Sequence, residues 1–542
     1  MGRAKFVIPV LLCLICNSYG LPRVDPLVDS KVGLIRGLTS SDGDYSMFLG
    51  IPYATVDPSN PFGPSLPHPG FEGTFDAYDD SAICPQEEEF NNTIVGTLDC
   101  LHLNVYVPNT ASTRNPRPVL VWIYGGAFSI GFAGRYTYGP KYLVEHDVIV
   151  VTLNYRVGPY GFMCLDSPRV PGNQGLKDQL SALRWVKNNI EAFGGDSDKI
   201  TIFGESAGAA SVDFHLTYTE EDLFNNVIIQ SGTALAPFAV QEQDIYLPIK
   251  LAEYLGFVTT NIDDALEFLG TVDTDLVIAA SLETKLQPLP CVEKEFDDVE
   301  RFITDHPLNV KVPKAKTVPV LIGFNNREQL MTYGNPSPEM FKSDIFYDSL
   351  ESYFTYDREH LARVAANVRQ FYIGDQEISE NVKSEITDFS SDFTFNHPTY
   401  RSIQKYFENG GEQIYHYLFS YDGDRNFVKR RRNITENGAA HADEITYLFD
   451  FAPFDETPSS DDQLIIDRMT TMWTNFAKFS NPTPEISDLL PLQWPAVTKE
   501  SLNCLNIDRE LSVQRRPFHD RVAYWDLFYK LNKEFQKGYR ED

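Results

Sequence analysis

The sequence has few basic residues for its size and almost no long apolar runs. Its 542 residues include 46 Lys and Arg against 76 Asp and Glu, which gives a formal net charge of −30. A chain this acidic repels phosphate backbones, so nucleic-acid binding is excluded as its main function. Beyond the N-terminus no segment approaches the roughly 20 apolar residues that cross a bilayer. We therefore expect neither a nucleic-acid partner nor a membrane span.

Internal repeats, low-complexity tracts and Gly/Ser linkers are also missing. The chain has 34 Gly and 34 Pro, and 42% of its residues are hydrophobic. This composition is typical of globular proteins rather than of disordered or collagen-like chains. Because no shift in composition divides the sequence, we predict one large domain over residues 21–542.

The one apolar run that stands out lies at the N-terminus. Residues 6–16 form an apolar stretch that follows Arg3 and Lys5, and small residues stand at Ser18 and Gly20. A short positive segment, a short apolar stretch and small residues at the −3 and −1 positions are the three parts of a signal peptide. We predict that residues 1–20 are a signal peptide and that the mature protein is secreted and extracellular.

Cysteine is scarce, with seven residues in the whole chain and two of them inside the predicted signal peptide. The other five are Cys84, Cys100, Cys164, Cys291 and Cys504. In a secreted protein an odd number leaves at least one thiol without a partner in the same chain. Cys84 and Cys100 are the nearest pair, and a disulfide that closes about 15 residues would contribute on the order of 3 kcal/mol. The sequence leaves the pairing of the other three open.

Two polar segments carry possible surface features. Asn91 and Asn433 each begin an Asn-X-Thr motif, and we predict both as N-glycosylation sites. Residues 429–432 read Lys-Arg-Arg-Arg. We interpret this cluster as a solvated surface loop, with a protease-processing site or an anionic docking patch as the alternatives.

Short apolar segments alternate with longer helical ones. Continuous apolar runs predict buried strands at residues 119–124, 148–153, 200–203, 227–230, 318–324 and 413–419. Unbroken runs of this kind are what a parallel sheet covered on both faces requires. Apolar residues recurring every three or four positions predict a helix over residues 176–190 that ends at Gly194, and residues 259–310 and 335–410 are also expected to be helical. The alternation predicts an α/β fold with a large, mostly parallel central sheet.

The strongest chemical motif follows the third predicted strand. Residues 204–208 read Gly-Glu-Ser-Ala-Gly and match the G-x-S-x-G pattern, between the strand at 200–203 and a segment of small residues that can begin a helix. A sharp turn from strand to helix lifts a serine hydroxyl above the sheet, and the helix N-terminus favours developing negative charge. Ser206 is therefore the candidate nucleophile.

A serine nucleophile also needs an oxyanion site, a base and an acid. The Gly-Gly-Ala sequence at 125–127 ends an earlier strand, and its backbone amides, with that of Ala207, can stabilise an oxyanion. In this fold the acid and the histidine follow the serine in that order. Glu328 comes just after the strand at 318–324, and His441 stands in a loop of small residues. Five histidines follow position 320, so the residues alone leave the base open: His360, His397, His416, His441 and His519.

Further motifs bring the sequence close to a known family. They lie at residues 99–106, 122–128, 154–162, 172–179, 193–196, 204–208, 230–232, 323–328 and 441–444. On these motifs the sequence resembles the type-B carboxylesterase/cholinesterase family of α/β-hydrolases, most closely the secreted carboxylesterases of insects. The resemblance covers nearly the whole chain and implies the α/β-hydrolase fold, with helices on both faces of the central sheet.

The resemblance also implies roles for particular residues. It makes Ser206 the nucleophile, Glu328 the acid and His441 the base, and it implies no metal and no organic cofactor. The amides that would form the oxyanion hole belong to Gly126, Ala127 and Ala207. Cys84 and Cys100 match the first disulfide of the family.

Several positions depart from the family pattern. No Trp lies between Cys84 and Cys100, where cholinesterases carry the indole that binds choline, so acetylcholine is not the expected substrate. Juvenile hormone esterases typically have Gln beside the nucleophile, whereas this chain has Glu205, which argues against that specialisation. Gln329 follows the acid where Gly is usual, which puts the local geometry in question. The family's second disulfide has no obvious counterpart near residues 250–270.

These observations predict a secreted serine carboxylesterase that forms an acyl-enzyme on Ser206 and acts on small-molecule esters of odorant or pheromone, dietary or xenobiotic type. One alternative is a cholinesterase-like adhesion or binding protein, which the presence of all three triad residues disfavours. Another is a lipase-like esterase for long-chain or steroid esters. The sequence does not indicate the oligomeric state.

Overall fold

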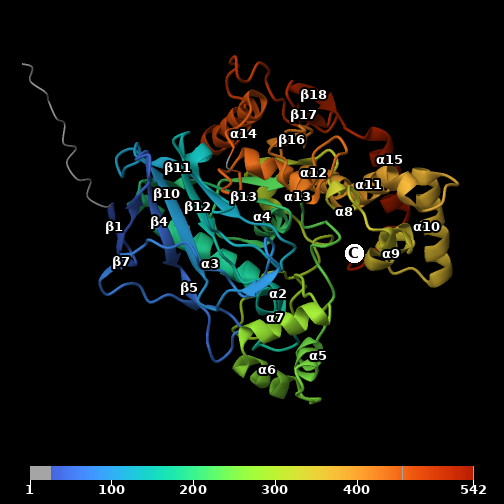
Figure 1. Cartoon of the computed structure of the whole chain (residues 1–542), viewed down its shortest axis with the longest axis horizontal. Coiled ribbons are helices and arrows are strands. Elements are labelled where there is room, and N and C mark those ends of the chain that lie inside the picture. Colours follow the sequence, from blue (N-terminus) through green and yellow to red (C-terminus); the bar gives the residue numbers. More distant parts are fainter. Residues whose placement is uncertain (1–25, 455, 541–542) are drawn as a thin grey trace, which may run out of the picture.

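A large mixed β-sheet forms the centre of the molecule (Figure 1). The computed structural model describes residues 26–454 and 456–540, so the predicted signal peptide lies outside the described residues. Within them the sheet has eleven strands in the order β18-β17-β16-β15-β14-β13-β11-β12-β10-β4-β3. In chain order these are β3 (Leu38–Thr39), β4 (Tyr45–Pro52), β10 (His102–Pro108), β11 (Arg117–Ile123), β12 (Ile149–Leu153), β13 (Gly195–Glu205), β14 (Asn226–Gln230), β15 (Val320–Asn325), β16 (Ile414–Phe419), β17 (Asn503–Ile507) and β18 (Ser512–Arg515).

The middle of this sheet is parallel, as the unbroken apolar runs predict. Every pairing from β12 through β11, β13, β14, β15 and β16 to β17 is parallel, whereas β3, β4, β10 and β18 add antiparallel edges. All residues of β12, β14, β15 and β16 are buried. Because successive side chains of a strand point to opposite faces, complete burial means that both faces are covered. The predicted α/β fold with a mostly parallel sheet is confirmed.

Long helices pack against this sheet. The helix predicted at 176–190 is α3 (Gln174–Asn189), which continues as a short 3-10 turn (Ile190–Phe193) and ends at Gly194 in the left-handed conformation, φ 82°. α4 (Ala207–Tyr218) packs against β11, β13 and β14, and α14 (Ser460–Phe479) packs against β11 and β13. The shorter helices near the sheet are α1 (Lys141–Val144), α2 (Gly158–Phe162), α8 (Leu330–Tyr333) and α13 (Phe427–Arg432).

Two helical lobes lie beside the sheet, each with its own apolar cluster. The first holds α5 (Leu247–Tyr254), α6 (Ile262–Thr271) and α7 (Thr274–Glu283), at the bottom of Figure 1. The helical prediction for residues 259–310 is wrong beyond Glu283, because residues 284–310 run as turns and irregular chain. The second lobe holds α9 (Ile345–Tyr353), α10 (Arg358–Ile373), α11 (Lys383–Ser391), a π-helical turn (Asp392–Asn396) and α15 (His519–Leu531). The π-helical turn leads into α12 (His397–Glu408), which packs against β15 of the central sheet.

Smaller strands complete the N-terminal part. β1 (Leu27–Ser30), β2 (Gly33–Arg36) and β7 (Thr74–Asp76) form one small sheet, β5 (Ala54–Thr55) pairs with β6 (Leu66–Pro67), and β8 (Gln86–Glu88) pairs with β9 (Thr93–Val95). In the described part of the chain no helix combines the length and the apolar character needed to cross a membrane.

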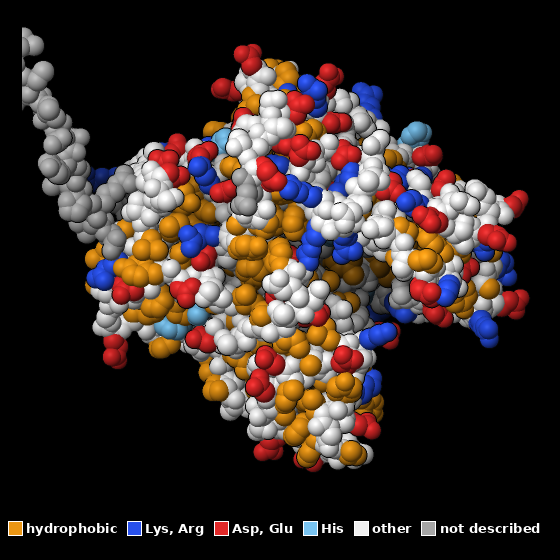
Figure 2. All heavy atoms as spheres, viewed as in Figure 1, with side chains coloured by type: hydrophobic (Ala, Val, Ile, Leu, Met, Phe, Trp, Pro, Cys, Tyr) orange, Lys and Arg blue, Asp and Glu red, His pale blue; other side chains and the backbone are white. Residues whose placement is uncertain are grey.

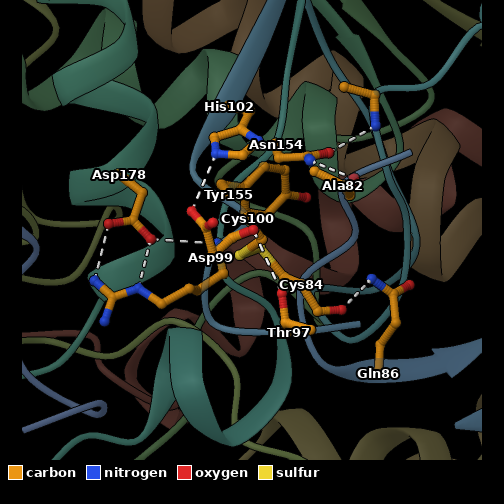
Figure 3. Close-up of a disulfide and its surroundings, with 12 residues drawn as sticks. Ala82, Cys84, Gln86, Thr97, Asp99, Cys100, His102, Asn154, Tyr155 and Asp178 are labelled. Carbon is orange, nitrogen blue, oxygen red and sulfur yellow. Dashed lines mark hydrogen bonds and ion pairs between the residues drawn. A yellow bond between two sulfur atoms is a disulfide. The ribbon is translucent and has the colours of Figure 1, made fainter. Parts of the chain in front are cut away.

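Two disulfides cross-link the described residues. Cys84 is joined to Cys100, and Figure 3 shows this bridge beside a hydrogen bond from Gln86 Nε2 to the Cys84 carbonyl, 3.0 Å. The second bridge joins Cys164 to Cys291, and Cys504 is a buried free thiol. The sequence left this pairing open because the expected position near residues 250–270 holds no cysteine. The two disulfides are compatible with an extracellular protein.

Candidate active site

The serine motif forms a strained turn between β13 and α4. Ser206 has φ 57° and ψ −122°, a conformation that non-glycine residues rarely adopt. The glycines around it leave no room for side chains: a Cβ at Gly208 would overlap the Ile123 carbonyl, and one at Gly232 would overlap the Ser206 carbonyl. The Ser206 amide also donates to the Gln230 carbonyl, 2.9 Å, which ties the turn to the neighbouring strand. The small residues of the motif therefore permit the close packing that this turn requires.

Glu328 and His441 come together at the same edge of the sheet. The imidazole Nδ1 of His441 lies 2.7 Å from Glu328 Oε2, and the His441 amide donates to the Glu328 carbonyl at 3.0 Å. The other carboxylate oxygen of Glu328 accepts a 2.7 Å hydrogen bond from the Asn325 amide at the end of β15. Glu328 is fully buried. These bonds hold Nδ1 toward Glu328 and leave Nε2 on the other side of the ring.

Ser206 and His441 line the same cavity, which has a volume of about 610 Å³. This volume lies within the usual range for small-molecule sites. Apolar side chains make up much of its wall: Ile130, Ile278, Leu282, Met331, Phe427, Val428, Ile445 and Phe451. No hydrogen bond joins the side chains of Ser206 and His441 in the described structure, and such contacts often tighten only when a substrate binds.

Backbone amides border the cavity next to the serine. Gly126 and Ala127 both have positive φ, 108° and 52°, and both line the cavity. Within the described residues neither amide N–H donates a hydrogen bond. Ala207 is the first residue of α4, so its N–H has no acceptor within the helix. In the described part of the chain these amides thus have no backbone acceptor and lie beside the cavity or directly after the serine.

Glu205 is the site residue whose contact sequence reasoning missed. Its Oε1 lies 3.1 Å from His441 Nε2, so the imidazole sits between two carboxylates. Burial lowers the pKa of His441, but the charges of Glu205 and Glu328 outweigh this and raise it to about 9. Burial also raises the pKa of Glu205 well above its usual range. A carboxylate directly before the nucleophile was the signal for this contact, because it shares the turn that presents Ser206.

Comparison with known proteins identifies the family of this chain. The family model described as "Carboxylesterase family" matches residues 24–525. The chain belongs to the carboxylesterase family. It is a carboxylic ester hydrolase with small-molecule ester substrates, and the resemblance found in the sequence is confirmed.

Proteins of similar sequence align with this esterase over most of its length. Bile salt-activated lipase of Rattus norvegicus is 33% identical, over 98% of this chain and 90% of that protein. Juvenile hormone esterase of Heliothis virescens is 32% identical, over 86% of this chain and 87% of that protein. The crystal structure of juvenile hormone esterase from Manduca sexta, with OTFP covalently attached, aligns with a TM-score of 0.83 at 26% identity and covers 94% of this chain and 100% of that chain.

A buried polar network supports the loop that carries His441 in the esterase. Glu444 accepts hydrogen bonds from Asn325 Nδ2, 2.7 Å, and Gln230 Nε2, 3.2 Å. Trp473 Nε1 donates to Gln230 Oε1 at 3.0 Å, so the network reaches α14. Burial raises the pKa of Glu444. The network links β14, β15 and the His441 loop, and thereby fixes the ends of the strands that carry the site.

The basic cluster at residues 429–432 is a helix rather than the loop that we expected, although Arg430, Arg431 and Arg432 are exposed to solvent as expected. It forms most of the short helix α13, where Lys429 is buried and its Nζ lies 2.5 Å from Asp422 Oδ1. Arg431 and Arg432 line the mouth of the cavity, and Arg431 pairs with Glu89. Figure 2 shows Lys and Arg side chains in the area where Figure 1 places α13. A helix with four consecutive basic residues can form here because acidic side chains pair with them.

The remaining sequence candidates lie away from the cavity. His416 is buried in β16 with Nδ1 3.0 Å from the Ile322 carbonyl, as its alternation in the strand predicted, and His397 pairs with Asp526. Gln329 has φ −82°, which any residue adopts, so its replacement of Gly does not distort the loop that carries Glu328.

The two asparagines of the predicted glycosylation motifs, Asn91 and Asn433, are both exposed. Among the described residues no group of His, Cys, Asp and Glu is arranged to hold a metal ion.

Proposed function

We propose that the esterase works through an acyl-enzyme on Ser206, with His441 as base and Glu328 as the acid that orients it. The observation that carries the proposal is the 2.7 Å contact between His441 Nδ1 and Glu328 Oε2 beside a cavity that Ser206 and His441 both line. The bond to Glu328 places the proton of the neutral imidazole on Nδ1, so Nε2 can accept a proton wherever His441 is neutral. The Manduca sexta relative with a covalently attached ligand supports covalent chemistry here.

The reaction has two acyl-transfer steps. His441 Nε2 takes the Ser206 proton as Oγ bonds to the carbonyl carbon, and the negative charge moves to the carbonyl oxygen. The amides of Gly126, Ala127 and Ala207 are the proposed donors to this oxyanion. As the oxyanion collapses, the bond to the alcohol breaks and His441 returns the proton to the leaving alcohol. A water molecule then repeats the sequence, releases the carboxylic acid and restores Ser206.

The cavity indicates the kind of ester. Its lining includes many apolar side chains together with Ser206, His441 and Glu205, and the paired side chains of Arg431 and Glu89 also line it. Such a space fits a small or medium-sized apolar ester better than a highly polar one. Odorant or pheromone, dietary and xenobiotic esters all meet this description.

We propose that the protein is secreted and glycosylated. The predicted signal peptide at residues 1–20, the two disulfides and the two exposed sequons at Asn91 and Asn433 support an extracellular location. A glycan would sit on the surface at both asparagines.

A lipase-like preference for long-chain esters is the second candidate, supported by the similarity to bile salt-activated lipase. Hydrolysis rates for a series of 4-nitrophenyl esters of increasing acyl length separate the two. A kcat/KM that peaks at short acyl chains supports the small-ester enzyme, and one that rises to the longest chains supports the lipase.

The test of the mechanism compares two serine-to-alanine variants of the secreted protein. Ser281 also lines the cavity but lies on α7, so Ser281→Ala is the matched control for Ser206→Ala. We expect Ser206→Ala to lose turnover by roughly 10⁶-fold, as in other serine-triad enzymes, and Ser281→Ala to keep it. Near-normal hydrolysis by Ser206→Ala would refute the proposed mechanism.

A further inference from the structure

One helical segment touches the residues on both sides of the acid. The amide of Gln329 donates to Ser391 Oγ at the end of α11, 3.0 Å, and Arg327 Nη1 lies 3.2 Å from Asp388 Oδ1 one turn earlier. Arg327 and Gln329 are the neighbours of Glu328 in the chain. The position of the acid loop is therefore set by α11.

The same segment reaches the base. α11 continues as the π-helical turn Asp392–Asn396, which places Phe395 against the imidazole of His441, with ring centroids 4.4 Å apart and planes inclined by 31°. Phe395 is buried and is backed by Phe238, whose ring centroid lies 5.7 Å away. A π-turn inserts an extra residue and changes the direction in which the following side chains point, and such turns are frequent at functional sites.

Buried charges anchor this turn to the C-terminal helix. Asp392 accepts hydrogen bonds from Tyr372 Oη, 2.6 Å, and Asn396 Nδ2, 2.8 Å, and Arg521 Nε lies 2.9 Å from Asp392 Oδ2. Arg521 Nη1 also lies 2.6 Å from Asp388 Oδ2. One guanidinium on α15 thus holds both α11 and the π-turn, and a buried pair of this kind is costly to break.

The hydrogen bond to Glu328 does not by itself fix the imidazole. A ring held at Cβ and at Nδ1 can still rock about the line between those two points, and this rocking moves Nε2. The backbone before His441 is itself fixed, because the amides of Ala439 and Ala440 donate to Asn326 Oδ1 and Asp443 Oδ2, 2.8 and 2.7 Å. The freedom that remains is therefore that of the imidazole side chain. Glu205 Oε1 lies 3.1 Å from Nε2 and is one restraint on this motion. A flat group packed on the ring face is a second restraint, and Phe395 is such a group.

We propose that residues 383–396 are the positioning element of the acid and base, and that Phe395 is the positioning residue that sets where His441 Nε2 points. The inference rests on the proposed roles of Glu328 and His441. Phe395 acts through the imidazole and is not among the residues that line the cavity. Its loss should therefore lower the rate of proton transfer more than it weakens substrate binding.

The neighbouring Phe393 provides a matched control. Both phenylalanines belong to the π-turn and both are 4% exposed, but Phe393 packs against Trp525 and Phe389 in the lobe rather than against His441. Phe393→Leu and Phe395→Leu therefore make the same chemical change at the same burial. Titration with an organophosphate to completion gives the concentration of reactive sites for each variant, so that kcat is expressed per working site.

We expect Phe395→Leu to lower kcat by roughly tenfold to a hundredfold with KM nearly unchanged, because a misplaced reacting group costs rate rather than affinity. The two variants should lower the melting temperature by similar amounts, because both make the same change at the same burial. Phe393→Leu should leave kcat within about twofold of the wild-type value. Equal kcat in the two variants, or a raised KM with unchanged kcat for Phe395→Leu, would overturn the proposal. Activity retained by Ser206→Ala would instead defeat the proposed function, so the two failures are distinguishable.

Discussion

Removing the charge of Glu205 should extend the activity of the esterase to lower pH. In the proposed mechanism His441 acts as a base only when it is neutral, and Glu205 Oε1, 3.1 Å from Nε2, favours its charged form. At an effective dielectric constant of about 20, Coulomb's law gives an attraction of roughly 5 kcal/mol at this distance, or about 4 pH units. Burial also raises the pKa of Glu205, so the Glu205 carboxyl group is charged over only part of the pH range of the assay. We therefore expect Glu205→Gln to lower the pKa of His441 by roughly 1–3 units.

The assay is the pH profile of kcat/KM for a soluble ester, because this ratio reports the ionisations of the free enzyme. The acid limb of Glu205→Gln should lie at lower pH than that of the wild type. Glu87→Gln serves as the control, since Glu87 also lines the cavity but has no contact with His441. An acid limb that stays in place, or that moves equally in both variants, would show that Glu205 does not control the ionisation of His441.

Two further sets of substitutions test the turn that presents Ser206 and the two disulfides. Gly208→Ala should remove most activity, because its Cβ would overlap the Ile123 carbonyl and shift the turn that holds Ser206; ester hydrolysis at near-wild-type rate would contradict this. Replacing Cys164 and Cys291 by Ser should lower the free energy of unfolding by about 5 kcal/mol, because this disulfide joins residues 127 apart in sequence. The same replacement of Cys84 and Cys100, which are 16 residues apart, should cost about 3 kcal/mol. Urea unfolding at fixed pH measures both losses, and the reverse ranking would count against the chain-entropy explanation.

The central sheet and the sharp turn at Ser206 were predictable from local sequence. Each parallel strand is covered on both faces and so appears as an unbroken apolar run, and the glycines around Ser206 are required by contacts within a few residues or with the adjacent strand. His441 and Glu328 could be placed only as residues that follow β16 and β15. Their 2.7 Å contact joins positions 113 residues apart, which no local pattern records.

The features that the sequence did not predict depend on distant partners. Cys291 meets Cys164 because irregular chain after α7 returns to the loop before α3. The helix α13 forms in a run of four basic residues because Asp422, Glu456 and Glu89 lie around it. Phe395 reaches His441 only through a π-turn, which has no signature in residue spacing.

Identification of the residue that carries the acyl group tests the account most directly. The purified secreted protein would be treated with an organophosphate, digested and analysed by mass spectrometry, with ester hydrolysis followed on the same sample. The account predicts one adduct, on the peptide that contains Ser206, formed in proportion to the activity lost, and no adduct on Ser206→Ala. Loss of activity with the adduct on any other residue, or full activity after complete modification of Ser206, would contradict it.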